Sequence, residues 1–414
     1  MNASTSPRAL GADATRGDGT GPVVIIGGGP IGLACALLLA RRGQASTLVD
    51  ARPVEALQRD RRLLALSRGT LDILEPLLGG GFAPLGEIHR IHVSSSGNPG
   101  SAQLGSRDFG GVAVGATIWY ADLVDALARA AQATALIQVQ RPRRALGIRQ
   151  RQRSVDVELD NGTVLRGPLA IDAEGSPPAG RTATHLALLA EVELDCAPGD
   201  AIERFTAEGP LALLPLPPST AQDNARRMSM VWCLPAALAR TRAGLPDAAL
   251  CTAIAQALGP RLGRPAGVGP RGTFPLLTHR LEQVCEHRVV HLGNAAQSLH
   301  PVAGQGFNLG MRDCLCLVDC LAETPLDAGT TAAAPGADPL LALHHYAARR
   351  RLDRTLFPAL TNLLPRVFGS SLAPLVVARS AALLGLDLLP ALRRPFTRLL
   401  MYGAPRWQPG GRIR

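Results

Sequence analysis

The chain has 414 residues, enough for two domains, and its hydrophobic content of 46% suits a globular protein with a large core. Its formal net charge of +10 comes with 43 basic residues, all of them arginine, yet no helix-turn-helix, zinc-finger or RNA-binding signature appears, so we exclude nucleic acid as a partner. No Cys-x-x-Cys pair occurs among the eight cysteines, which argues against a metal site. Residues 1–21 are polar and lack the apolar stretch of a signal peptide, so we expect a disordered start and a cytoplasmic protein.

The first motif follows an apolar segment, residues 22–26, that predicts a buried parallel strand. The sequence GGGPIG (27–32) comes directly after it, then a helix over 33–42, a strand over 47–49 and an acid. This order is typical of a dinucleotide-binding unit. In such a unit Gly27 forms the turn and Gly29 lets a pyrophosphate approach closely. Gly32 allows the helix to pack on the strand, and Asp50 binds a ribose hydroxyl. The pattern is in register throughout, but it does not by itself distinguish FAD from NAD.

The middle of the chain alternates short strands and helices. A basic segment, residues 60–67, precedes a helix over 67–78. Residues 85–118 read as short strands, a helix begins near residue 122, and the alternating segment 155–159 turns back at Asp-Asn-Gly. A core strand over 169–172 is followed by Ala173, Glu174 and Gly175. Residues 186–274 are strand-rich, with a helical excursion over 246–262, and predict a sheet whose apolar face suits an apolar ring.

A second small-residue motif lies at 293–313. A buried strand over 288–292 leads into a tight turn with Asn294, and Pro301 fixes the chain ahead of Gly304, Gln305 and Gly306. Apolar side chains then recur at helical spacing to about residue 321. The N-terminus of this helix presents free N–H groups and a positive dipole end, so the motif predicts a socket for a flat, anionic or electron-rich group.

Together these motifs resemble the flavin-dependent aromatic hydroxylases, in detail the branch that hydroxylates ubiquinone precursors. Residues 60–67 resemble the family's D-x-R-x-x-A-L-S, which places Arg62 at the pyrophosphate or the incoming nicotinamide nucleotide. The chain also matches the family's motif A-D-G-x-x-S-x-x-R, except that Glu174 replaces the Asp and Pro178 replaces the Ser. The stretch ERFTAEGPLALLPL (203–216) closely resembles the ubiquinone branch, and the likeness runs from residue 23 to about 398.

The resemblance implies an α/β fold: a Rossmann-like FAD-binding domain with an inserted mixed β-sheet substrate domain and a helical C-terminal region, as in p-hydroxybenzoate hydroxylase. The FAD-binding domain would comprise 22–84, 119–182 and 275–323. The substrate domain would comprise 85–118 and 183–274. Residues 324–339 would be a linker, and 340–414 the C-terminal helical region.

It also implies FAD as cofactor, NAD(P)H as reductant and molecular oxygen as co-substrate. Reduced flavin would form a C4a-hydroperoxide that passes one oxygen to an aromatic ring, in this branch a polyprenyl phenol of ubiquinone biosynthesis. The residues expected to bind the cofactor are Gly27, Gly29, Gly32, Asp50, Arg62, Glu174, Asn294, Pro301, Gly304, Gln305, Gly306 and Asn308. No catalytic base is assigned, because His89, His92 and His300 are each more often structural.

Two other functions stay open: hydroxylation of a soluble aromatic acid, and a non-catalytic flavin-binding scaffold in a complex of ubiquinone-biosynthesis proteins. The C-terminal region leaves two roles open as well. Residues 363–401 mix apolar stretches with arginines, which suits either a helix in the lipid interface or helices packed on the FAD-binding domain. The first role predicts peripheral attachment to the inner face of the cell membrane.

Overall fold

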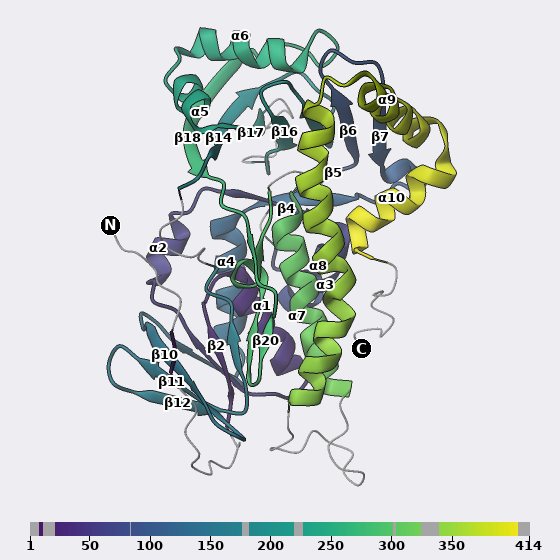
Figure 1. The fold of residues 1–414 in the computed structure, drawn as a ribbon. Helices are drawn as coiled ribbons and strands as arrows, with labels where there is room; N and C mark the ends of the chain where they lie inside the picture. The colour runs from purple at the N-terminus through teal and green to yellow at the C-terminus, as the bar shows by residue number, and fades with distance from the viewer. Residues whose placement is uncertain are drawn as a thin grey trace.

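The computed structural model of the chain describes residues 8–10, 21–82, 84–175, 182–218, 227–300, 304–323 and 339–404. Figure 1 shows two halves stacked one above the other, with the long helix α8 running beside both. The lower half contains the predicted dinucleotide-binding unit, and the upper half contains a large sheet.

A six-stranded sheet, in the order β20-β21-β13-β2-β3-β9, forms the centre of the lower half. β2 (Val23–Ile26) pairs in parallel with β3 and β13, and all four of its residues are buried because both faces of the sheet are covered. The remaining strands are β3 (Ser46–Val49), β9 (Ile137–Gln140), β13 (Ala170–Asp172), β20 (Cys285–Glu286) and β21 (Val289–His291).

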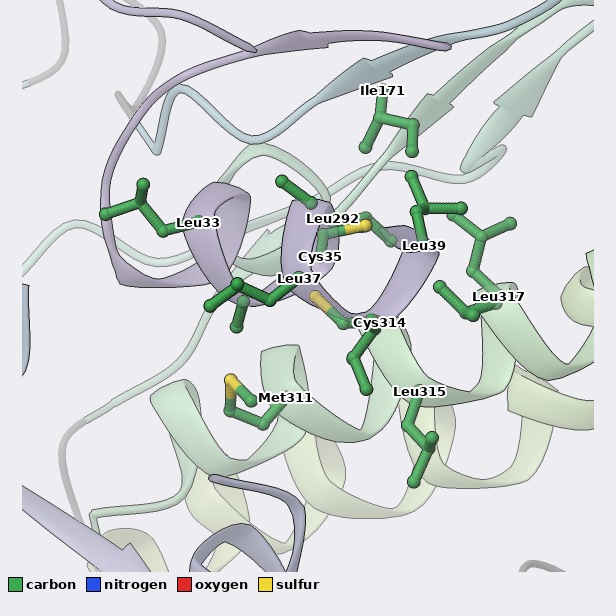
Figure 2. Close-up of a cluster of buried hydrophobic side chains, with 14 of the residues drawn as sticks. Leu33, Cys35, Leu37, Leu39, Ile171, Leu292, Met311, Cys314, Leu315 and Leu317 are labelled. Carbon is green, nitrogen blue, oxygen red and sulfur yellow. The ribbon is translucent and has the colours of Figure 1, made fainter. Parts of the chain in front are cut away.

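Two helices from distant parts of the sequence pack together on one face of this sheet. They are α1 (Pro30–Arg41) and α7 (Gln305–Glu323). Figure 2 shows Cys35 and Leu39 of α1 beside Cys314 and Leu317 of α7, with Ile171 of β13 above them. This contact brings the two glycine motifs to the same end of the sheet. The layer also includes α2 (Val54–Gln58), α3 (Arg68–Leu78) and α4 (Tyr120–Gln132).

The other face packs on a four-stranded sheet in the order β1-β10-β11-β12. Its strands are β1 (Arg8–Leu10), β10 (Ala145–Gln150), β11 (Val155–Leu159) and β12 (Val164–Gly167). The hairpin of β11 and β12 turns at the predicted Asp-Asn-Gly, with Gly162 at φ 79°. β1 departs from the expectation of a disordered start, because the open edge of β10 offers backbone groups with which a passing segment can pair.

The upper half is a seven-stranded sheet in the order β18-β14-β17-β16-β15-β6-β7. β6 runs parallel to β15 while the other neighbours are antiparallel, so the sheet is mixed, as predicted. Its strands are β6 (Arg90–Ser95), β7 (Ser101–Gly105), β14 (His185–Glu193), β15 (Asp200–Phe205), β16 (Pro210–Pro215), β17 (Arg227–Pro235) and β18 (Gly267–Pro275). Helices α5 (Ala236–Ala243) and α6 (Asp247–Leu258) cover one face around the buried Trp232. The predicted fold class is confirmed.

A three-stranded sheet, β4-β8-β5, lies between the halves. Its strands are β4 (Leu63–Ser67), β8 (Gly115–Trp119) and β5 (Gly86–Ile88). β19 (His279–Arg280) pairs with β22 (Gln297–Ser298), and single 3₁₀ turns occur at η1 (Ser106–Asp108) and η2 (Gly293–Ala295).

Three helices close the described chain: α8 (Leu340–Gly369), α9 (Ala373–Leu388) and α10 (Pro390–Tyr402). α8 continues through Pro358 and Pro365. Among the described residues no single helix is long and apolar enough to cross a membrane, and the pair α8 and α9, which is apolar enough when taken together, is bent by 119°. The three helices cover the free face of the seven-stranded sheet, so an apolar space is enclosed between them.

Candidate active site

The turn between β2 and α1 requires glycine at two positions for reasons within the protein itself. Gly27 has φ 105°, and a Cβ there would lie 2.5 Å from the carbonyl oxygen of Ala173. A Cβ on Gly32 would lie 1.9 Å from the carbonyl oxygen of Gly27. Both positions therefore keep the turn and the helix tightly against the sheet, as the sequence motif predicts.

Gly29 differs, because no protein atom excludes a side chain there. A Cβ on Gly29 would meet nothing closer than the Tyr120 hydroxyl at 3.4 Å and the Arg52 guanidinium at 3.8 Å. α1 starts at Pro30 with no side-chain cap and no acidic residue in its first turn. The uncapped helix end beside an open glycine fits an anionic group such as a pyrophosphate.

Asp50 is buried at the end of β3 and fixes this turn. Its Oδ2 accepts the backbone N–H of Gly28 at 2.7 Å, and its Oδ1 accepts the backbone N–H of Arg52 at 2.7 Å. The guanidinium of Arg141 lies 3.5 Å from the same carboxylate and donates to the Gly28 carbonyl at 2.7 Å. Arg141 follows β9, which neighbours β3, so this residue joins the site through strand order alone and the sequence motif did not reveal it.

Arg62 lies near the same turn, within a cluster that includes Tyr120. Its guanidinium donates to Asp60 at 2.6 Å and stacks 4.8 Å from the centre of the Tyr120 ring. Tyr120 is buried, and its hydroxyl faces Gly29. The structure places Tyr120 closer to Gly29 than Arg62, whose guanidinium is already paired with a carboxylate.

Glu174 follows β13 at the same end of the sheet. Burial, together with the charges of Asp172 and Asp50, raises the pKa of its carboxyl to about 7. Asp172 accepts the backbone N–H of Glu174 at 3.0 Å and lies 2.9 Å from Nδ1 of His291 on the neighbouring β21. Asp172 therefore ties the segment that carries Glu174 to the strand that leads into the second motif.

The second motif meets the first at this end of the sheet. Asn294 is exposed, and its Cβ lies 3.7 Å from where a Cβ on Gly175 would be. Gly304 has φ 58°, while Gly306 has open space where a side chain would stand. α7 carries no acidic residue in its first turn. Pro301 lies outside the described residues.

The two polar side chains at the start of α7 have different surroundings. The Asn308 amide donates to the carbonyls of Ala65 and Gly304 at 3.0 and 2.9 Å and accepts the backbone N–H of Ser67 at 2.8 Å. It holds α7 against β4. Gln305 is 5% exposed and donates to the carbonyl of Leu400 on α10 at 3.3 Å. Sequence reasoning grouped both side chains with the cofactor, and that role stays a prediction.

An apolar cavity of about 480 Å³ lies next to the start of α7. The seven-stranded sheet, β4 and the three C-terminal helices enclose it, and its lining reaches Gly304 and Gln305. Most lining side chains are aliphatic or aromatic. The polar residues among them are Ser67, Glu203, Gln305, Asn308, Thr361, Arg379 and Thr397. The helices α8 to α10 thus form one wall of the cavity, which no sequence motif indicated.

The three histidines that sequence reasoning considered do not line this cavity. Burial and the nearby His185 lower the pKa of His300 to about 4, so its ring is neutral at physiological pH. Burial also lowers the pKa of His92, and Nε2 of the exposed His89 lies 2.9 Å from Glu87. None of them gains a catalytic role from its position.

FAD fits the donor set at this end of the sheet. The uncapped start of α1, a first turn of α7 without acidic residues, an open glycine and a buried acid are the features that a dinucleotide with a flat ring requires. Which residues contact the cofactor stays a prediction.

Comparison with known proteins gives the same result. An FAD binding domain family matches residues 20–176. The chain is 30% identical to ubiquinone hydroxylase UbiL of Rhodospirillum rubrum over 97% of this chain and 94% of that protein. It is 28% identical to 3-demethoxyubiquinol 3-hydroxylase of Escherichia coli over 90% of this chain and 96% of that protein. The crystal structure of p-nitrophenol 4-monooxygenase PnpA from Pseudomonas putida shares the fold, with a TM-score of 0.70, 15% identity and coverage of 94% of this chain and 99% of that one. The chain belongs to the FAD-dependent aromatic hydroxylases, in the branch of ubiquinone biosynthesis.

Proposed function

We propose that the chain hydroxylates a polyprenyl phenol intermediate of ubiquinone biosynthesis, with NAD(P)H as reductant and molecular oxygen as co-substrate. The cavity between the seven-stranded sheet and the C-terminal helices is the observation that carries this proposal. Its volume of about 480 Å³ is in the range of small-molecule sites, and its lining is mostly carbon. Two relatives named as hydroxylases of ubiquinones or their precursors support the same substrate class.

In this proposal the bound FAD supplies the redox chemistry and the activation of oxygen. The chain positions the substrate ring and keeps water away from it. The sheet and helices exclude water from the ring, which favours transfer of oxygen to the substrate over its loss to solvent. The first turn of α7, free of acidic side chains, presents positive potential where the predicted flavin edge would lie.

A soluble aromatic acid as substrate is less favoured by the cavity. A carboxylate would need a cationic partner there. Among the described lining residues Arg379 is the one cation, and its Nη1 already donates to the carbonyls of Val367, Phe368 and Ser370 at 2.8, 2.7 and 2.8 Å. These bonds satisfy the end of α8, so this guanidinium serves the fold.

We further propose that α9 meets a lipid surface. This helix lines the cavity with Leu383 and Leu386 and presents other apolar side chains outward, with Val377, Leu384 and Leu388 67%, 51% and 65% exposed. Its arginine, Arg379, points inward and is 6% exposed. This arrangement reverses that of a helix on a water-exposed surface, and it suits an interfacial helix that faces hydrocarbon. The proposal places the protein in the cytoplasm, peripheral on the inner face of the cell membrane, where other ubiquinone-biosynthesis proteins are candidate partners.

Two of the arginines within residues 363–401 are structural. Arg379 caps α8, and Arg393 is 7% exposed and donates to Asp108 at 2.7 and 3.0 Å. Arg394 also pairs with Asp108, at 3.5 Å, but 63% of its side chain is exposed and can still meet anionic headgroups. The electrostatic part of membrane binding therefore rests on fewer arginines than the sequence indicated, and the apolar part rests on α9.

The substrate class is tested by NAD(P)H oxidation in flavin-loaded protein. We expect a phenol with a short prenyl tail to stimulate oxidation at least tenfold, while a soluble hydroxybenzoate has little effect. Stimulation by the hydroxybenzoate alone would favour the aromatic acid. Stimulation by neither, in protein with full flavin content, would favour the scaffold.

A further inference from the structure

Two uncharged, buried side chains that line the apolar cavity carry atoms that make no hydrogen bond within the described part of the chain. They are Gln305 at the start of α7 and Thr397 on α10, 5% and 1% exposed. The atoms are the amide oxygen Oε1 of Gln305 and the hydroxyl Oγ1 of Thr397. A buried polar atom without a partner is costly, so two of them on one apolar cavity indicate a polar group of a ligand.

The two side chains belong to one local structure. Gln305 donates its Nε2 to the carbonyl of Leu400, which fixes the amide against α10. Thr397 lies three residues before Leu400 on the same helix, and residues three apart share a helix face. The amide is therefore held with its nitrogen on α10, the helix that also carries Thr397, and its oxygen is left without a partner among the described residues.

Thr397 also behaves unlike the comparable threonine of α8. The hydroxyl of Thr361 donates to the carbonyl of Phe357, four residues earlier, at 3.0 Å. This is the usual hydrogen bond of a threonine hydroxyl within a helix. The hydroxyl of Thr397 makes no such bond. At a site that is 1% exposed, valine would pack as well as threonine unless the hydroxyl has a partner.

Most of the other polar groups on the cavity are already engaged. Asn308 bonds to the backbone of Ser67, Thr361 bonds to its own helix, and the Nη1 of Arg379 caps α8. Glu203 lies across the cavity on β15, between Val93 and Ala212 of the neighbouring strands. Glu203 is therefore the alternative binding partner for a polar group of the ligand, and an experiment must distinguish it from Gln305 and Thr397.

We propose that Gln305 and Thr397 together bind the ring hydroxyl of the aromatic substrate. The phenolic O–H would donate to Oε1 of Gln305, and the Thr397 hydroxyl would donate to the phenolic oxygen. The rest of the substrate would lie against the apolar lining. This inference rests on the proposed function and adds to it a positioning pair that sets the ring beside the first turn of α7. It also gives α10 a direct part in substrate recognition.

The test measures binding and requires no turnover. The FAD-loaded oxidised protein is titrated with ortho-geranylphenol and with its O-methyl ether, and binding is followed by the change in flavin absorbance. Wild type should prefer the phenol about tenfold, the worth of roughly one good hydrogen bond. Thr397→Val and Gln305→Leu should lose this preference and keep their affinity for the ether. Thr397→Ser should retain it, as should the matched control Thr361→Val.

Three outcomes would overturn the proposal. If Thr397→Val and Gln305→Leu bind with full flavin content and keep the preference, the two atoms hold a water molecule and do not recognise substrate. If Glu203→Gln alone abolishes the preference, the ring hydroxyl is held on the sheet. If wild type binds neither probe, the proposed substrate class is wrong, and Gln305 and Thr397 have no phenol to bind. This failure differs from the first two because it appears before any substitution is made.

Discussion

Individual residues of the β2–α1 turn separate what the fold needs from what a ligand needs. Gly27 and Gly32 are required by atoms of the protein itself, at 2.5 and 1.9 Å from a would-be Cβ. Gly29 has no such neighbour. The motif therefore combines two structural glycines with one whose small size serves a group that approaches from outside.

This difference predicts distinct phenotypes. Gly29→Val should fold with a near-normal thermal midpoint and lose bound flavin, because the valine branches occupy the space over the turn. Gly32→Ala should lose more than ~3 kcal/mol of stability, because its Cβ overlaps a backbone carbonyl. Flavin absorbance per protein and thermal unfolding distinguish the two. A Gly29→Val protein that stays yellow at wild-type stoichiometry would remove the N-terminal motif from the cofactor site.

The raised pKa of Glu174 predicts that the stability of the protein depends on pH. Its pKa is raised from 4.5 to about 7 by burial and by neighbouring carboxylates, so the folded protein holds this proton more tightly than the unfolded chain. The free energy of unfolding should therefore fall as pH rises from about 4.5 to about 7, by on the order of 1–3 kcal/mol from this group.

Glu174→Gln should abolish that part of the fall. Thermal unfolding of flavin-free protein at pH 5 and pH 8 measures it, and the variant should gain most over wild type at pH 8. An equal effect of the substitution at both pH values would show that the carboxyl titrates at its ordinary pKa.

At the scale of elements, the parts with a strong local signal were predictable. The strand, glycine turn and helix at residues 22–42 and the Asp-Asn-Gly hairpin follow from local backbone chemistry, and the structure has both. The parts set by contacts between distant segments were not. Arg141 and Tyr120 reach the turn only through the order of strands and helices, and Gln305 contacts α10 across 95 residues of sequence.

The C-terminal helices show the same limit. Their composition left interfacial and packed roles open, and the contacts show packing for some of their arginines while the interfacial role of α9 stays a proposal. Arg393 packs onto Asp108, while α9 presents leucines outward. A pattern of arginines and leucines cannot say which arginine faces inward, because that depends on the surface that the helix covers.

Membrane attachment through α9 predicts a selective effect of apolar substitutions. Leu384→Ser with Leu388→Ser should reduce flotation with anionic liposomes severalfold without changing flavin content, because each leucine buried in the interface contributes roughly 1–2 kcal/mol. Leu146→Ser with Val164→Ser is the matched control, since these residues are 51% and 53% exposed on the distant four-stranded sheet. Equal losses from both pairs, or no flotation of wild type at low salt, would count against attachment through α9.

At the scale of the whole molecule, the function arises where three parts of the chain meet. The six-stranded sheet positions the starts of α1 and α7, the seven-stranded sheet provides an apolar roof, and α8 to α10 close the remaining side. The outer surface of the closing helices carries exposed leucines as well, on α9 among others. A substrate with an aromatic head and a long prenyl tail matches this arrangement, because its head needs a dry site and its tail needs an apolar one.

The most direct test of this account is the fate of molecular oxygen. Flavin-loaded protein is supplied with NAD(P)H, a short-chain prenylated phenol and isotope-labelled oxygen, and the product is analysed by mass spectrometry. The account predicts a hydroxylated phenol that carries one labelled oxygen atom for each NAD(P)H consumed. A product without the label, or consumption of NAD(P)H that yields only hydrogen peroxide with every prenylated phenol tried, would contradict it.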